Sequence, residues 1–216
     1  MFDLRHTVAS DYLSQFSYPW EALSGIKFFI IKYGAELDEK KYNQLKPLVW
    51  VHRDTKIAPT ADIDAPCIIG RGSEVRHCAF IRGSALIGEN CVVGNSTEIK
   101  NSIIFDGVQI PHFNYVGDSI LGYKTHMGAG AITSNVKSDK SPVTVNADDG
   151  KIQSGLKKFG AIICDFVEIG CNSVLNPGTV IGKNTTVYPL SNVRGVIPQN
   201  SIYKNSGTII KKTGFL

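Results

Sequence analysis

The sequence predicts a mainly β protein built as a parallel β-helix, and a repeated six-residue pattern supports this fold class. A branched or long aliphatic residue recurs every six positions over most of the chain. That period fits neither an isolated α-helix nor the two-residue alternation of a strand. It suits coils with three short flat faces, in which each hexapeptide points one aliphatic side chain inward and neighbouring coils cover each other's apolar edges. Residues three hexapeptides apart are then expected to stack.

The inward positions form two regular series joined by a less regular stretch. The first series is Val51, Ile57, Ile63, Ile69, Val75, Ile81, Ile87, Val93 and Ile99. The second series is Ile163, Ile169, Leu175, Ile181, Val187 and Val193. The joining stretch continues with Ile104, Ile110, Val116, Leu121 and Met127. Two of its steps, 99 to 104 and 116 to 121, span five residues instead of six, which predicts two tightened corners.

Residues 1–48 lie outside this pattern and predict a helical cap on the coils. Tyr18 to about Leu37 carries an apolar stripe at three- and four-residue steps, with Pro19 in the first turn, which favours a helix. A second, short helix is expected from Asp38 to Leu45. Such a cap can cover an open end of the solenoid, where strand edges are otherwise unpaired.

The coils are expected to occupy residues 49–198, with one long excursion and a tail. The six-residue pattern stops over 134–162, where Asp148-Asp149-Gly150 resembles a hairpin turn. Long excursions from a rigid coil are usually functional or disordered. Residues 199–216 are expected to form a C-terminal tail along the outside of the coils.

The composition is that of an ordinary globular protein, with 43% hydrophobic residues, 19% charged residues and a net charge of +4. The basic residues form no dense stripe, so no nucleic-acid partner is expected. Five cysteines without a CxxC pair indicate neither a zinc site nor a disulfide framework, and Cys67 and Cys91 read as small residues in tight corners. The sequence shows no signal peptide and no membrane span, which predicts a cytoplasmic location.

Arg82 and Lys100 each follow an inward isoleucine, and their separation of 100 − 82 = 18 residues places them on successive coils. Adjacent strands lie about 4.8 Å apart, so both cations can converge on one anion. A phosphate group suits this pair, because arginine offers a fork of donors and lysine a point charge. The alternatives are two solvated side chains that splay apart, or a pairing with Glu98.

His112 and Tyr115 follow in the same irregular stretch. A histidine can accept a proton from an amine or an alcohol near neutral pH, although a lone histidine is more often structural. At the start of the excursion, Asn135, Lys137 and Lys140 can close over a ligand, or simply be solvated.

Four ordered segments carry a resemblance to a known family. They are Ile81-Arg82-Gly83-Ser84, Glu98-Ile99-Lys100, His112 to Asp118 and Gly128 to Asn135. They resemble the acetyltransferase half of the bifunctional enzymes that make UDP-N-acetylglucosamine, which are hexapeptide-repeat acyltransferases. Residues 154–163 look like the archaeal type of these sugar-phosphate enzymes. The resemblance covers roughly residues 50–198 and implies a left-handed β-helix that forms homotrimers with sites between subunits.

The resemblance also implies a function and residue roles. The activity is acetyl-CoA-dependent N-acetylation of an amino-sugar 1-phosphate. In this sequence, Arg82 and Lys100 would bind the sugar 1-phosphate, and His112 would be the general base that deprotonates the 2-amino group. The remaining roles are sugar contacts for Tyr115, Asn135 and Glu98, and contacts with the acetyl-CoA arm for Ala129 and Cys171.

Some positions depart from the family pattern. His126 stands where an asparagine is common on the sugar-binding coil, and Cys171 stands where a serine is common. Either Lys137 or Lys140 can be the loop lysine that meets the acceptor. No glycine-rich phosphate loop opens the chain, so no pyrophosphorylase activity is expected from it alone.

Two other classes of function compete with this interpretation. A metal-dependent enzyme resembling γ-class carbonic anhydrases needs three imidazoles around zinc, normally with two histidines five residues apart. The histidines are His6, His52, His77, His112 and His126, and no such pair occurs. A non-catalytic protein that keeps a sugar-phosphate pocket is the other alternative.

Overall fold

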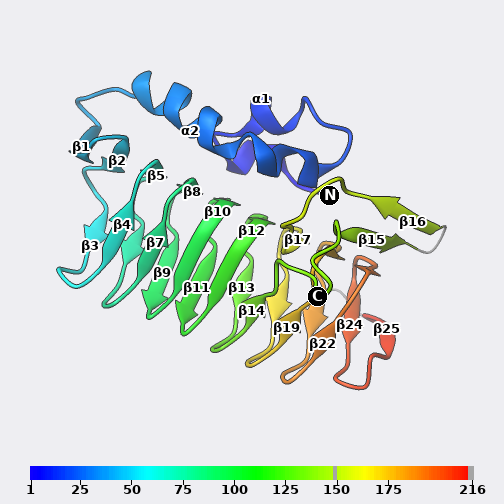
Figure 1. Cartoon of the computed structure of the whole chain (residues 1–216). Helices are drawn as coiled ribbons and strands as arrows, with labels where there is room; N and C mark the ends of the chain where they lie inside the picture. Colours follow the sequence, from blue (N-terminus) through cyan, green and yellow to red (C-terminus); the bar gives the residue numbers. More distant parts are fainter. Residues whose placement is uncertain (148–149, 214–216) are drawn as a thin grey trace.

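The computed structural model describes residues 1–147 and 150–213 and confirms the parallel β-helix (Figure 1). The strands stack in parallel into a sheet of 14 strands and a sheet of 9 strands. The inward series predicted from the hexapeptides lies in the core, where Ile69, Ile87, Ile99 and Ile163 are fully buried. Cys67 and Cys91 are buried as expected.

The coils present three faces, numbered 1 to 3. Face 1 comprises β4 (Asp62–Asp64), β7 (Phe80–Arg82), the start of β10 (Glu98–Ile104), the start of β12 (Tyr115–Leu121), β14 (Ile132–Thr133), β19 (Val174–Leu175) and β22 (Asn192–Val193). Face 2 comprises β2 (Val49–His52), β5 (Cys67–Ile69), β8 (Ala85–Ile87), the ends of β10 and β12, β17 (Ala161–Ile163), β20 (Thr179–Ile181) and β23 (Val196–Ile197). The two five-residue steps fall in β10 and β12, because each of these strands continues from face 1 round a corner into face 2.

Face 3 belongs to the second sheet and extends further along the chain than expected. It comprises β3 (Lys56–Ile57), β6 (Glu74–Val75), β9 (Val92–Asn95), β11 (Gln109–His112), β13 (His126–Met127), β18 (Glu168–Ile169), β21 (Thr186–Val187) and β24 (Ser201–Tyr203). The parallel register therefore continues past residue 198, since β24 pairs with β21. The remaining tail turns back as β25 (Ile209–Lys211), antiparallel to β24.

The N-terminal segment does not cap an end of the solenoid, which corrects the expectation from the sequence. Its helices are η1 (Leu4–His6), α1 (Ser10–Leu13), η2 (Pro19–Ser24) and α2 (Ile26–Ala35). They lie lengthwise over face 2, where α2 packs on β5, β8 and β10 and η2 packs on β12 (Figure 1). The helix expected from Tyr18 to Leu37 forms in two pieces separated at Gly25.

The reason is an apolar column that points outward on face 2. Ile68, Leu86, Ile103 and Ile120 are aligned by strand register, and none is more than 1% exposed. The N-terminal segment buries Trp20, Leu23, Ile26 and Ile30 in the same core. Covering this column removes its apolar surface from water, which stabilises the fold.

The short helix expected from Asp38 to Leu45 is wrong. That stretch contains β1 (Tyr42–Lys46), which pairs antiparallel with β2. An extended conformation there covers the free edge of the first coil, so tertiary pairing overrides the local preference.

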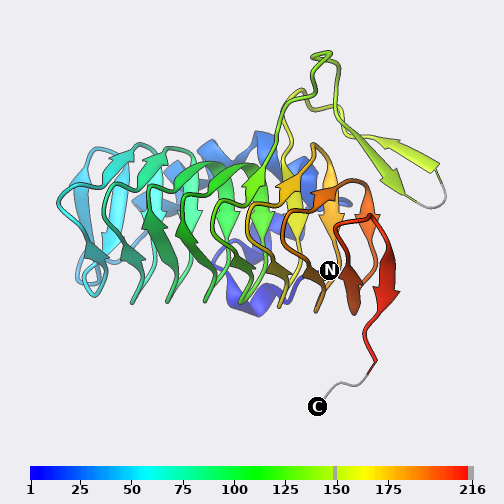
Figure 2. The same cartoon turned by 90° about the horizontal axis from the view of Figure 1, so that it is seen from below.

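The excursion contains the expected hairpin. Strands β15 (Thr144–Ala147) and β16 (Gly150–Gln153) pair antiparallel and project from the C-terminal half of the coils (Figure 2). The turn residues Asp148 and Asp149 lie outside the described part of the chain. Among the described residues, no helix combines the length and the apolar character needed to cross a membrane.

Candidate active site

The stacking predicted for Arg82 and Lys100 is present on face 1. Ile99 pairs with Ile81 in parallel register, so the residues that follow them occupy the same position on adjacent rungs. Both side chains point outward, with Arg82 exposed and Lys100 half-buried. The rungs of one sheet lie about 4.8 Å apart, which is close enough for both cations to contact a single anion.

Each cation already has a carboxylate partner. Arg82 Nη1 donates to Glu98 Oε1 at 2.6 Å, which is the pairing that the sequence left as an alternative. This bond also raises the pKa of the Arg82 guanidinium, so the group stays charged. Lys100 Nζ lies 3.4 Å from Asp118 Oδ2. The four side chains together carry no net charge.

Asp118 is a residue of this cluster that the analysis of roles from the sequence missed. It is 4% exposed and also accepts hydrogen bonds from Asn101 Nδ2 at 2.8 Å and Asn135 Nδ2 at 2.5 Å. A signal was present, because a lone acidic residue stands in the otherwise buried strand β12. Buried carboxylates need partners of this kind.

Tyr115 and Asn135 join the cluster from neighbouring rungs. Tyr115 pairs with Glu98 in the strand register, and Asn135 Nδ2 lies 3.2 Å from the Tyr115 hydroxyl. Burial, followed by the charges of Asp118 and Glu98, raises the pKa of the Tyr115 phenol. The phenol therefore stays protonated at neutral pH and can donate a hydrogen bond to a ligand.

His112 lies round the corner from this cluster, at the end of face 3. Its backbone is held by two bonds: its N–H donates to Asn114 Oδ1 at 3.0 Å, and its carbonyl accepts from the N–H of Gly130 at 3.0 Å. Asn114 is buried and ties the corner to the next coil through the carbonyls of Gly128 and Ala131. The backbone is therefore fixed while the His112 side chain is exposed.

Ala129 and Cys171 stack on His112 in one corner column. Gln109 pairs with His126, which places His112 beside Ala129, and Met127 pairs with Ile169, which places Ala129 beside Cys171. The excursion separates Ala129 from Cys171 in sequence but not in space. The resulting column offers small side chains on the two rungs that follow the histidine.

Three predicted site residues lie elsewhere in this chain. His126 is aligned with Gln109 on the neighbouring rung, and Gln109 precedes His112 by three residues, or about 10 Å along β11. The Nδ1 atom of His126 lies 2.8 Å from Glu168 Oε2. Lys137 lies 3.6 Å from Asp139 and lines a cleft of about 300 Å³ that Arg194 also borders. Lys140 is exposed in a turn, where its N–H donates to the Lys137 carbonyl.

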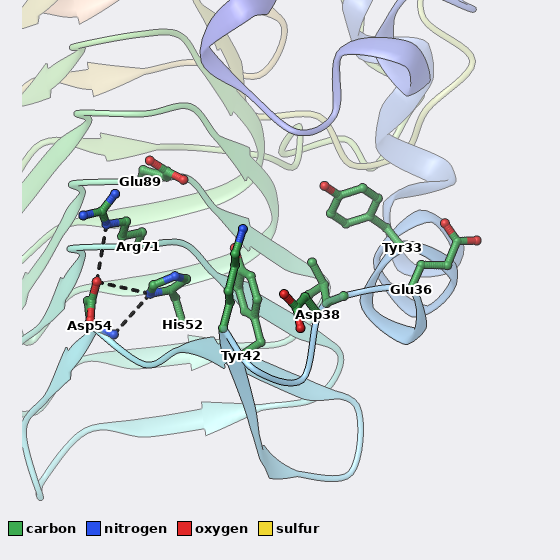
Figure 3. A pocket seen from close by; sticks show the side chains of 10 residues that line it. Tyr33, Glu36, Asp38, Tyr42, His52, Asp54, Arg71 and Glu89 are labelled. Atoms are coloured by element: carbon green, nitrogen blue, oxygen red, sulfur yellow. Dashed lines mark hydrogen bonds and ion pairs between the residues drawn. The ribbon is translucent and has the colours of Figure 1, made fainter.

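A larger cleft lies away from all these residues, between the end of α2, the β1–β2 hairpin and the first coil turns (Figure 3). It has a volume of about 640 Å³, and its charges are partly paired internally. Arg71 Nε lies 3.3 Å from Asp54, and His52 Nδ1 accepts the Asp54 N–H. Within residues 1–147 and 150–213, no three side chains of His, Cys, Asp or Glu gather as a metal site.

Comparison with known proteins confirms the resemblance predicted from the motifs. The family model described as the GMPPB C-terminal domain matches residues 65–169. The bifunctional protein GlmU of Methanococcus maripaludis is 37% identical over 204 residues, which is 93% of this chain and 49% of that protein. A bifunctional sugar-1-phosphate nucleotidylyltransferase/acetyltransferase of Sulfurisphaera tokodaii is 37% identical over 51% of this chain and 28% of that protein. The chain thus spans about half the length of the first of these relatives.

Among solved structures, similarity is weaker. A putative acetyltransferase of Bacillus cereus is 14% identical with a TM-score of 0.42, over 76% of this chain and 77% of that one. The acetyltransferase domain of PglB from Neisseria gonorrhoeae, in complex with acetyl coenzyme A, is 16% identical with a TM-score of 0.35, over 72% of this chain and 54% of that one.

Proposed function

We propose that this protein transfers the acetyl group of acetyl-CoA to the amino group of an amino-sugar 1-phosphate, of the glucosamine or galactosamine 1-phosphate type, in nucleotide-sugar synthesis. The observation that supports this most is the stack of Arg82 and Lys100 on adjacent rungs, beside the phenol of Tyr115 and the amide of Asn135. This set offers two cations to a phosphate and neutral donors to sugar hydroxyls. Sequence similarity to a protein named as a bifunctional sugar-1-phosphate nucleotidylyltransferase/acetyltransferase supports the same reaction.

The charge balance of the cluster suits a ligand that carries both signs. Arg82 and Lys100 are compensated by Glu98 and Asp118, so an incoming phosphate meets cations that are held in place but not in excess. An amino-sugar 1-phosphate carries an ammonium as well as a phosphate. The Glu98 carboxylate, which is half-buried beside Arg82, can accept a hydrogen bond from the ammonium or from a sugar hydroxyl.

His112 acts as the general base. The lone pair of the neutral 2-amino group attacks the thioester carbonyl while the imidazole takes one proton from the nitrogen. A new C–N bond forms, the C–S bond breaks, and the imidazolium returns its proton to the departing thiolate of coenzyme A. Ala129 and Cys171, on the rungs beyond His112, leave room for the extended arm of acetyl-CoA along the same corner.

The active assembly is a homotrimer with sites between subunits. The cation cluster and the His112 column lie on either side of one corner of the prism, and a second copy placed against that corner closes the pocket. His126, Lys137 and Lys140 then contact the acceptor bound mainly by a neighbouring subunit. Loop lysines suit this role because they reach beyond their own coils.

The test is a thiol-release assay with acetyl-CoA on glucosamine 1-phosphate and galactosamine 1-phosphate. His112→Ala is expected to abolish turnover while calorimetry shows that both ligands still bind. His77→Ala is the matched control, because His77 is exposed in the same corner column two rungs earlier. Normal turnover in His112→Ala would remove this residue from the role of base.

Thiol release, sugar-phosphate binding and a metal analysis of the purified protein together decide between the classes of function. Sugar-phosphate binding without thiol release, in the wild-type protein, would favour a non-catalytic binding protein. Stoichiometric zinc in the purified protein would favour the metal-dependent alternative.

A further inference from the structure

Asp118 contacts Lys100 and Asn135, two residues that bind the sugar phosphate in the proposed function. Its Oδ2 accepts from Asn135 Nδ2 at 2.5 Å and lies 3.4 Å from the Lys100 ammonium. Its Oδ1 accepts from Asn101 Nδ2 at 2.8 Å. The side chain of Asp118 is 5% exposed, whereas that of Lys100 is 21% exposed. The carboxylate therefore lies beneath the ammonium and is poorly placed to touch a ligand itself.

These contacts form a ladder that is local to the candidate site. Asn101, Asp118 and Asn135 occupy equivalent corner positions on three successive rungs. On the other described coils, strand register places Ala65, Gly83, Pro177 and Gly195 at this corner. The backbone can therefore turn this corner without a polar side chain. Among the described coils, the polar ladder of Asn101, Asp118 and Asn135 occurs only beside Lys100 and Tyr115.

The attraction of a phosphate gives no reason for a buried carboxylate at this position. Burying a charge costs several kcal/mol unless it is well paired, and a negative charge next to a phosphate pocket weakens anion binding. A carboxylate at this position must provide something that offsets both effects. The contacts indicate a role in orientation, because the Asp118 carboxylate fixes both the Lys100 ammonium and the Asn135 amide.

We propose that Asp118 is a positioning residue: it orients Lys100 and Asn135 so that they bind the sugar phosphate. Asn101 extends the arrangement to the N-terminal segment, because its Nδ2 also donates to the carbonyl of Leu23 at 3.2 Å. The segment over face 2 thereby anchors the ladder that orients the groups on face 1. This inference rests on the proposed function for the identity of the acceptor.

Asp118→Asn separates orientation from charge. Asn tolerates the left-handed backbone of this position, where φ is 49°. The variant keeps the shape of the side chain and loses the charge, so electrostatics alone predicts tighter phosphate binding. Loss of orientation predicts the opposite: the KM for glucosamine 1-phosphate rises about tenfold while the KM for acetyl-CoA is unchanged. Asn101→Ala, which removes one contact of the ladder, raises the same KM about threefold.

Asp165→Asn is the matched control. Asp165 is also a fully buried aspartate paired with a lysine, with Lys183 Nζ 2.7 Å away. It accepts the N–H groups of Asp3 and Tyr123 and lies between β17 and β18, at the corner between faces 2 and 3 and away from the cluster. This variant is expected to lower the midpoint of thermal unfolding without changing the KM for the sugar phosphate.

An unchanged or lower KM in Asp118→Asn, or an equal rise in Asp165→Asn, would overturn the proposal. Crystal structures of the wild type and Asp118→Asn give a second measurement that does not depend on activity. The Lys100 ammonium and the Asn135 amide are expected to move in the variant, and unmoved groups would also overturn it. A wild-type protein without thiol release would contradict the proposed function, and the crystal structures would still decide the role of Asp118.

Discussion

Faces 1 and 2 both point aliphatic residues inward but differ in what they point outward. On face 2 the outward column is aliphatic, with Ile68, Leu86 and Ile103 in register, and the N-terminal segment covers it. On face 1 the outward positions include the cations of Arg82 and Lys100, and they remain open to solvent in part. The hexapeptide thus specifies the coils, while the outward residues decide whether a face is covered by the protein's own chain or stays open to solvent.

The largest expected effect comes from removing the two cations of face 1. Arg82→Ala combined with Lys100→Ala deletes two charge-assisted contacts, which together are worth about 4 kcal/mol of binding free energy, or roughly a thousandfold in Kd. Calorimetry with glucosamine 1-phosphate measures this loss. Stability is also expected to fall, because the loss of Lys100 leaves the buried Asp118 carboxylate without its cation, so binding is measured well below the unfolding temperature of the variant.

Arg76→Ala is the control for this double variant. Arg76 makes a similar ion pair, with Glu74 at 3.0 Å, but at face 3. Its removal should leave the affinity for the sugar phosphate unchanged. Equal losses in the two proteins would mean that general charge, and not the stacked pair, attracts the ligand.

The second effect tests face 2 and is a loss of folding free energy. Ile103→Ala deletes a fully buried side chain between β10 and the N-terminal segment, which is expected to cost about 3 kcal/mol. Urea denaturation measures it. Ile210→Ala on β25, where the side chain is 38% exposed, should cost less than about 0.5 kcal/mol. Similar costs at the two sites would argue against the tight cover that distinguishes face 2.

The contrast between the faces also shows what the sequence could predict. The period of six placed the inward residues correctly, and the two five-residue steps marked the strands that turn a corner. The cover of face 2 was missed, although its signal is present: an aliphatic pair such as Leu86-Ile87 or Ile103-Ile104 recurs on successive coils. One member of each pair points inward and the other must be covered from outside.

The candidate site was only partly predictable for a different reason. The positions of Arg82 and Lys100 follow from register alone, because stacking depends on the backbone. The role of Asp118 depends on which side-chain oxygen meets which donor, and no periodicity encodes that. The pairing of Tyr42–Lys46 as a strand likewise depends on a neighbouring edge that local sequence does not reveal.

A smaller effect concerns how closely the N-terminal segment fits face 2. Gly34 lies within α2, and a Cβ added there would overlap the indole ring of Trp50. Gly34→Ala should therefore destabilise the fold by about 1 to 2 kcal/mol, although alanine is the better helix former. Thermal unfolding measures the change. Lys27→Ala, at an exposed position of the same helix, should be neutral, and a stabilised Gly34→Ala would show that the segment packs loosely.

The smallest effect is expected at the Tyr115 phenol, which accepts a hydrogen bond from Asn135. Tyr115→Phe removes one neutral donor, so affinity for the sugar phosphate should fall by about 1 kcal/mol. The variant also has a signature in alkaline solution. Burial first, and then Asp118 and Glu98, raise the Tyr115 pKa in the folded state. The unfolded chain therefore releases this proton at lower pH, and stability falls as pH rises above about 10.

Denaturation curves measured at neutral pH and at several alkaline values test that sign. The wild-type protein should lose stability more steeply than Tyr115→Phe once the pH passes the ordinary pKa of tyrosine, and the two should run parallel below it. Tyr188→Phe is a suitable control, because Tyr188 is 41% exposed. Parallel curves throughout would mean that burial and the carboxylates of face 1 do not raise the Tyr115 pKa, and the phenol would then not be enclosed in the cluster as the structure places it.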